Sequence, residues 1–145
     1  MNPLKCGWLA VLALLVLSGC ASGPMYSEMK GKIAPLRSDE GRVFVYRDSS
    51  LGAAVTPSVA INGKIVGVSR SNGFFYSDLP PGNYKISAET EVERSLSFTL
   101  AAGETKYVRA SMSFGILVGR LNFDLVNQAA GEEALQGLAY SPEIK

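Results

Sequence analysis

The fold is indicated most clearly by the stretch Ser58-Val59-Ala60-Ile61-Asn62-Gly63-Lys64-Ile65-Val66-Gly67-Val68. An asparagine followed by a glycine supplies the positive φ angles that both central positions of a type I′ hairpin turn require. With this turn, Ile61 pairs with Lys64 and Val59 pairs with Val66. The side chains of Val59, Ile61, Val66 and Val68 are then expected to share one buried face of a β-hairpin.

The segment before this hairpin, residues 41–47, predicts a strand that is buried on both faces. Its alternating Val-Phe-Val-Tyr sequence at 43–46 places apolar side chains on either side, which is typical of a central strand. Arg47 and Asp48 at its end are expected to form a solvated strand end, and an ion-binding pair is the alternative.

Further strands are predicted where apolar and polar residues alternate between turn signals. Leu79-Pro80-Pro81-Gly82 predicts a type II turn, because proline fixes φ at the first central position and glycine permits a positive φ at the second. Glu89, Glu91 and Glu93 are expected at a solvated hairpin end, with a Ca²⁺ site as the alternative. The additional predicted strands cover residues 74–76, 83–88, 94–100, 105–112 and 121–126.

Helical signals are limited to the two ends of this region. Tyr26, Met29 and Ile33 fall at helical spacing before Pro35, which favours one short helix lying on the domain; a partner-binding peptide and a disordered tether are the alternatives. Residues 128–137 are the best candidate for a short C-terminal helix. Together these signals predict an all-β fold: an antiparallel β-sandwich of about seven to eight strands, with a short N-terminal helix or tether.

The N-terminal segment is typical of a signal peptide. Lys5 is followed by an unbroken apolar run at residues 8–17, and a run of this length is short for a membrane-spanning helix, which needs ~20 apolar residues. An uncleaved membrane anchor is the alternative. The predicted organisation is a signal peptide at 1–19, a lipidated cysteine and tether at 20–40, a sandwich domain at 41–138 and a polar tail at 139–145.

The residues that close this segment, Leu17-Ser18-Gly19-Cys20, resemble the lipobox of bacterial lipoproteins. The resemblance implies cleavage between Gly19 and Cys20 and acylation of the cysteine thiol by more than one chain. Each buried methylene contributes ~0.8 kcal/mol, so several chains make release from a membrane negligible. Because Ala21 and not an aspartate follows the cysteine, the resemblance also implies the periplasmic face of the outer membrane.

Four turn and strand motifs recur in one order: residues 41–47, 58–63, 79–84 and 102–104 before Tyr107. In this order they resemble a group of small bacterial lipoproteins known as a domain of unknown function, which is similar to PEGA-type and carboxypeptidase-regulatory-like sandwiches. The resemblance covers roughly residues 41–127. It implies a fold but no catalytic residues, because turn and strand chemistry says little about activity.

Composition argues against several functions. Lys5 is the only charged residue among 1–19, so without that segment the 14 basic and 13 acidic side chains become balanced, unlike the basic surface that nucleic-acid binding needs. The chain has no histidine, and its two cysteines are Cys6, lost with the signal peptide, and Cys20. This argues against His-assisted catalysis and Cys/His metal sites, so we expect no enzyme, metal or cofactor.

The expected function is that of a membrane-anchored, non-catalytic binding or scaffold module of the cell envelope, with an envelope protein as partner. The alternative is a glycan, peptidoglycan or small-molecule binder that uses Phe74, Phe75 and Tyr76 for stacking, although such residues are more often core. An apolar segment between glycines is the candidate interaction patch; we expect it to be buried, and an exposed surface for a membrane or a protein is the alternative. The patch consists of Phe114, Ile116, Leu117 and Val118.

Overall fold

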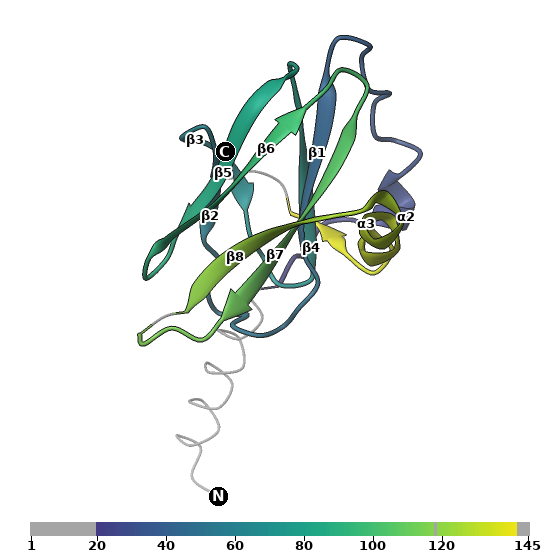
Figure 1. Ribbon diagram of the computed structural model, residues 1–145. Coiled ribbons are helices and arrows are strands. Elements are labelled where there is room, and N and C mark those ends of the chain that lie inside the picture. Colours follow the sequence, from purple (N-terminus) through teal and green to yellow (C-terminus); the bar gives the residue numbers. More distant parts are fainter. Residues whose placement is uncertain (1–19, 118, 142–145) are drawn as a thin grey trace, which may run out of the picture.

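The computed structural model describes residues 20–117 and 119–141, which form a β-sandwich with two short helices (Figure 1). The all-β prediction is therefore confirmed. The helices are α2 (Tyr26–Met29) and α3 (Gln128–Leu135). The strands are β1 (Gly41–Arg47), β2 (Ser58–Ile61), β3 (Lys64–Val68), β4 (Gly73–Leu79), β5 (Gly82–Glu89), β6 (Glu93–Leu100), β7 (Thr105–Ser113), β8 (Arg120–Val126) and β9 (Ala139–Tyr140).

The strands form a five-stranded sheet in the order β8-β7-β1-β4-β9 and a four-stranded sheet in the order β3-β2-β5-β6. Most neighbours are antiparallel, as predicted, but β1 pairs in parallel with β7, and β4 pairs in parallel with β9. Parallel neighbours need a long crossover connection. Between β1 and β7 this connection consists of strands β2 to β6, and all of them except β4 belong to the four-stranded sheet. Local sequence patterns do not reveal this arrangement.

The predicted hairpin is present, with a different register away from its turn. Asn62 and Gly63 have φ angles of 49° and 80°, and Ile61 pairs with Lys64 as expected. Val59, however, pairs with Gly67 and not with Val66, because a β-bulge shifts the register after the first pairs. The bulge leaves all four predicted valine and isoleucine side chains, at 59, 61, 66 and 68, buried.

The predicted type II turn at residues 79–82 is not formed. Gly82 has no positive φ and is the first residue of β5. The segment crosses from one sheet to the other, since β4 and β5 belong to different sheets. The Tyr84 hydroxyl donates to the Pro80 carbonyl at 2.6 Å across this crossover.

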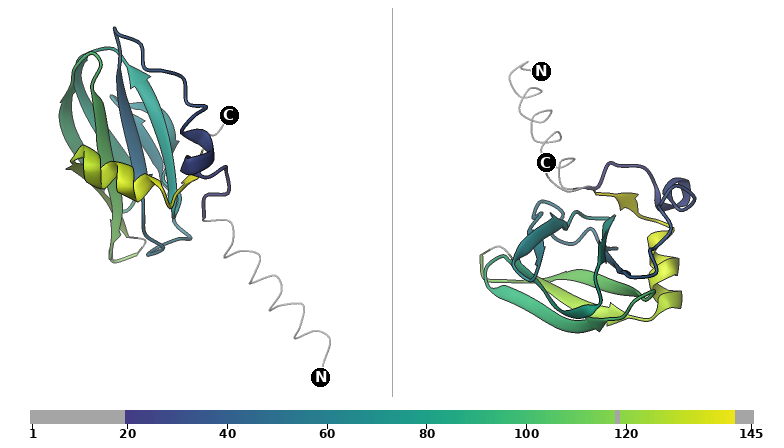
Figure 2. Two further views of the ribbon diagram at one scale, coloured as in Figure 1. Left: turned by 90° about the vertical axis from the view of Figure 1, so that its right-hand side faces the viewer. Right: turned by 90° about the horizontal axis from the view of Figure 1, so that it is seen from above.

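Strand β1 is buried on both faces, as predicted for a central strand. Val43 and Val45 point into the core between the two sheets, whereas Phe44 and Tyr46 belong to a second apolar cluster on the outer face of the five-stranded sheet. The two helices cover that outer face (Figure 2). The second cluster is completed by Tyr26, Phe74, Tyr107, Leu135 and Leu138.

The segments on either side of the sandwich pack against it and against each other. Helix α2 lies on the domain through buried Tyr26, which confirms the favoured prediction for this region. The backbone N–H of Tyr26 donates to the Leu138 carbonyl at 2.9 Å, and that of Tyr140 donates to the Pro24 carbonyl at 2.8 Å. Strand β9 and buried Ser141 extend the packed domain beyond residue 138.

We predict that Gly63→Ala lowers the free energy of unfolding by about 1–2 kcal/mol, because alanine is strained in the left-handed conformation. Gly137→Ala is the matched control: an added Cβ meets nothing within 4 Å at either position, and only Gly63 has a positive φ. The control is expected to change stability by less than about 0.5 kcal/mol. Equal effects of the two substitutions in urea unfolding would contradict a strained turn.

Candidate functional site

Several loops lie at one end of the sandwich, the lower end in Figure 1, which we call the Cys20 end because Cys20 pairs with Ser71 there. Strands β1 and β7 run in parallel, so the loops that follow them, at residues 48–57 and 114–119, leave from the same end. Gly73 pairs with Arg47, which brings the preceding residues 69–72 to this end as well. The opposite end carries the loops at 79–82 and 101–104.

Cys20 is an exposed free thiol that lies directly against the domain. It forms a parallel β-bridge with Ser71, and the backbone N–H of Ala21 donates to the Ser71 carbonyl at 3.0 Å. The buried Ser71 hydroxyl in turn donates to the Ser49 carbonyl at 2.7 Å. The start of the predicted tether is therefore fixed to the domain and is not a free linker. Gly19, the other residue of the predicted cleavage site, lies outside the described residues.

Arg47 organises the loops at this end, and the prediction of a solvated strand end is wrong for it. The side chain has 0% exposure and donates to the carbonyls of Leu51 at 2.6 Å, Val55 at 2.9 Å and Ser69 at 3.4 Å. Loop carbonyls, which have no partners in a sheet ladder, take the place of water around the guanidinium.

The alternative of an ion-binding pair is also wrong, because Asp48 accepts a hydrogen bond from Arg109 at 2.9 Å and not from Arg47. Burial lowers the pKa of the Arg47 guanidinium below its usual range. Among residues 20–117 and 119–141, no group is placed to form a hydrogen bond with the buried Arg47 Nε or the buried Ser69 hydroxyl. Backbone carbonyl dipoles thus stabilise the guanidinium charge, and the hydrogen bonds to Arg47 hold the loops together.

The candidate interaction patch is exposed where the structure describes it, contrary to the expectation of burial. The exposed fractions are 87% for Phe114, 86% for Ile116 and 86% for Leu117. Val118 lies outside the described residues. The segment leaves the end of the sandwich, where no facing sheet is available to cover it. Beside it, Leu51 contributes to a shallow hollow of about 240 Å³ that Phe114 and Leu117 also line.

The acidic hairpin end contacts this loop. The Glu91 carboxylate accepts from the backbone N–H of Ile116 at 2.8 Å and 3.1 Å, and Glu93 pairs with Lys85 at 2.7 Å. Glu89 and Glu93 are cross-strand partners at the end of β5 and β6, whereas the Glu91 carboxylate is bound to the loop backbone, so the three glutamates do not form one site. Among the residues that the structure describes, no group of three or more acidic, histidine or cysteine side chains is placed to hold a metal ion.

The aromatic platform proposed for a glycan binder is not available to a ligand. Phe74 and Phe75 are buried, and the half-buried ring of Tyr76 lies under the Arg42 guanidinium, 4.9 Å from its carbon to the ring centroid. Aromatic residues of this kind are more often part of the core than of a binding site, and Phe74 and Phe75 follow that tendency.

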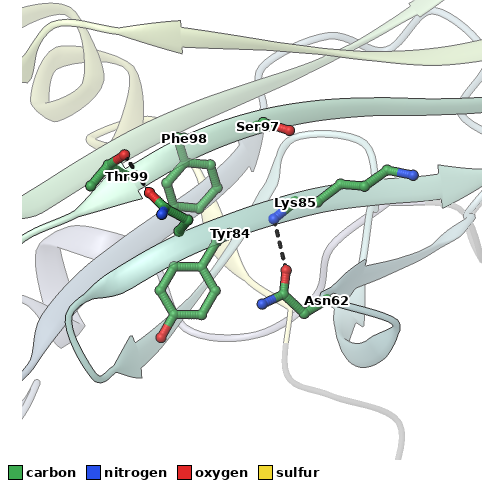
Figure 3. Close-up of a pocket in the computed structure, with 7 residues that line it drawn as sticks. Asn62, Tyr84, Lys85, Ser97, Phe98 and Thr99 are labelled. Atoms are coloured by element: carbon green, nitrogen blue, oxygen red, sulfur yellow. Dashed lines mark hydrogen bonds between the residues drawn. The ribbon is translucent and has the colours of Figure 1, made fainter.

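A hollow on the four-stranded sheet was not predicted (Figure 3). It measures about 410 Å³ and is lined by residues of β5 and β6 with the hairpin turn beside them. The Asn62 side chain accepts from the Lys85 backbone N–H at 2.8 Å, and the rings of Tyr84 and Phe98 stack with centroids 6.0 Å apart. The alternation of polar residues along β5 and β6 predicts one solvent-exposed sheet face. No signal in the sequence indicates that the hairpin turn at Asn62 lies beside that face.

Within the part of the chain that the structure describes, this arrangement is a small β-sandwich module with the exposed Cys20 thiol and several loops at one end. The family model of DUF2846, a protein of unknown function, matches residues 37–120. An uncharacterized protein of Haemophilus influenzae is 33% identical over 130 residues, which cover 86% of this chain and 77% of that relative. The chain belongs to the DUF2846 family.

No solved structure matches the chain. Neither helix within residues 20–117 and 119–141 is long and apolar enough to cross a membrane.

We predict that Arg47→Met destabilises the protein by about 2–4 kcal/mol, because three loop carbonyls lose their donor in a buried setting. Removing a buried charge relieves some desolvation, but the orphaned carbonyls outweigh that gain. Arg109→Met, which breaks a partly exposed ion pair, is the control and is expected to cost at most about 1 kcal/mol. Urea unfolding measures both, and faster proteolysis within residues 48–57 should accompany only Arg47→Met.

Proposed function

We propose that the protein is a lipoprotein of the bacterial cell envelope that acts as a non-catalytic binding or scaffold module. Residues 1–19, outside the described part of the chain, act in this proposal as a signal peptide cleaved between Gly19 and Cys20. Acyl chains on Cys20 hold the domain on a membrane, at the periplasmic face of the outer membrane. The proposal also includes a relationship between this domain and the PEGA-type sandwiches of envelope lipoproteins.

The observation that carries this proposal is the position of Cys20. Its thiol is exposed and free, so acyl chains can be attached without disturbing the core. The β-bridge to Ser71 holds the residue at the very end of the sandwich. A membrane at this end leaves the opposite end and the wet sheet face open to other molecules.

A binding role follows from the anchor. An anchor confines the domain and any partner on the same membrane to a thin layer, which raises the effective concentration of each for the other. Weak contacts are then sufficient for association. The open face of the four-stranded sheet is the surface that supports such contacts.

A glycan, peptidoglycan or small-molecule binder is the second candidate, and the hollow in Figure 3 is the observation that favours it. Tyr84 offers a half-buried ring beside the polar side chains of Asn62 and Thr99. Rings flanked by a few polar groups are typical of small-ligand sites. Retention of the protein on isolated peptidoglycan, lost in Thr99→Ala, would support this candidate over a protein-binding module.

We predict that Cys20→Ala abolishes acylation, so that the variant accumulates as an unlipidated or uncleaved precursor. Mass spectrometry of the protein from a Gram-negative host, combined with membrane fractionation, measures this. Ser22→Ala, two residues further along, is the control and should be processed like the wild type. The anchor proposal fails if Cys20→Ala is processed and also fractionates with the membrane as the wild type does, or if wild-type protein begins at Cys20 with an unmodified thiol.

We also predict that in-cell crosslinking of the acylated protein captures specific envelope proteins, identified by mass spectrometry. The same partners should be lost or strongly reduced with Cys20→Ala, because acyl chains no longer hold the domain on the membrane of its partners. Capture of the same partners by both forms would contradict a role for the anchor in binding. Retention on peptidoglycan without protein partners would favour the second candidate.

A further inference from the structure

We propose that Phe114, Ile116 and Leu117, here called the loop tip, insert into the membrane leaflet that holds the acyl chains of Cys20. The inference rests on the proposed function and adds an orientation to it. The sandwich stands on the bilayer at its Cys20 end, held by the lipid and by the loop tip. Its opposite end points away from the membrane.

The loop tip and Cys20 are joined by a short series of contacts across one end of the domain. Cys20 bridges to Ser71, whose hydroxyl bonds to the Ser49 carbonyl. Two residues further, the Leu51 carbonyl accepts from buried Arg47, and Leu51 lines the same hollow as Phe114. Figure 1 shows the loop between β7 and β8 at the lower end of the molecule.

Because Cys20 is fixed on the domain surface, its position restricts how the domain can be oriented on a membrane. The hydrogen bond from the Ala21 N–H to the Ser71 carbonyl fixes the acylated residue on the domain surface. The Cys20 end must therefore lie at the bilayer surface whenever the acyl chains are inserted. A long flexible linker would permit any orientation, and the observed bridge does not.

The free energy of apolar burial favours insertion of the tip. Its three side chains are 86–87% exposed, and transfer of large apolar side chains out of water is favourable. Residues 111–119 carry no charged side chain, so nothing within the loop opposes entry into the interface. The insertion is driven by apolar surface and should not weaken when salt is added.

Glu91 supports the loop and limits its depth. Its carboxylate accepts from the Ile116 N–H, which satisfies a backbone donor that hydrocarbon would leave unpaired. The charge of that carboxylate keeps the backbone of Ile116 at the headgroup level, so that only the apolar side chains enter further. The tip is therefore expected to reach only about 5–10 Å into the interface, as peripheral apolar groups do.

A bilayer fits the tip better than a protein partner does. A stable protein interface buries about 800 Å² on each partner, with a polar rim around an apolar centre. The tip is a single narrow loop whose neighbour is the acidic hairpin end at 89–93. A lipid interface accepts a narrow apolar projection without a matching pocket.

Tryptophan fluorescence in proteoliposomes tests the insertion. Trp8 is the only tryptophan of the chain and is lost with residues 1–19 in the proposed processing, so Ile116→Trp places a single reporter in the tip. The acylated full-length product is reconstituted into phosphatidylcholine vesicles containing brominated acyl chains. We expect a blue-shifted emission and bromine quenching severalfold stronger than for Ala102→Trp, an exposed site at the opposite end, at low and high salt alike.

Phe114→Trp provides a second reporter that keeps an aromatic side chain, should Ile116→Trp fold poorly. If mass spectrometry finds no acyl chain on Cys20, the proposed function fails. If Cys20 is acylated but the tip reporters are quenched no more than the one at 102, the orientation proposal alone is overturned. Unquenched tip reporters that crosslink to an envelope protein would assign the tip to a protein partner and overturn it equally.

Discussion

The loops of the Cys20 end depend on one buried guanidinium. Arg47 ends the central strand β1, has no exposed surface and donates to the carbonyls of Leu51, Val55 and Ser69. These bonds connect the loop after β1 to the segment before β4. That segment also holds Cys20 through Ser71, so the buried charge supports the loops on which the exposed thiol is positioned.

The central position of β1 explains why both termini of the described chain lie on the domain. One face of β1 packs into the sandwich core, so its other face, with Phe44 and Tyr46, needs a separate cover. The helices α2 and α3 supply that cover, and α3 approaches closely because Gly131 lies against the Tyr107 ring, where a Cβ would come within 2.3 Å. The N-terminal and C-terminal segments are thereby held side by side.

This architecture separates the two ends of the molecule. Under the proposed function, the Cys20 end combines the lipid, the exposed loop tip and Leu51, which are all apolar, on loops held by Arg47. The opposite end and the hollow around Tyr84 remain in water (Figure 3). A domain built in this way can be fixed in orientation on a membrane while it keeps its polar surfaces available for binding.

Local chemistry by itself determined much of this protein: the all-β class, the Asn62-Gly63 turn, the short helices and Cys20 as the candidate anchor. Each depends on residues close together in the chain, through side-chain period, turn conformation or a compact motif. Only the tertiary structure decided the burial of Arg47, the exposure of Phe114 and the bulge in the hairpin. Burial of a charge depends on carbonyls up to 22 residues away, and exposure of an apolar loop depends on whether another element covers it. Such long-range contacts leave no local pattern. The sequence could therefore indicate Cys20 as a candidate anchor but not the residues that surround it.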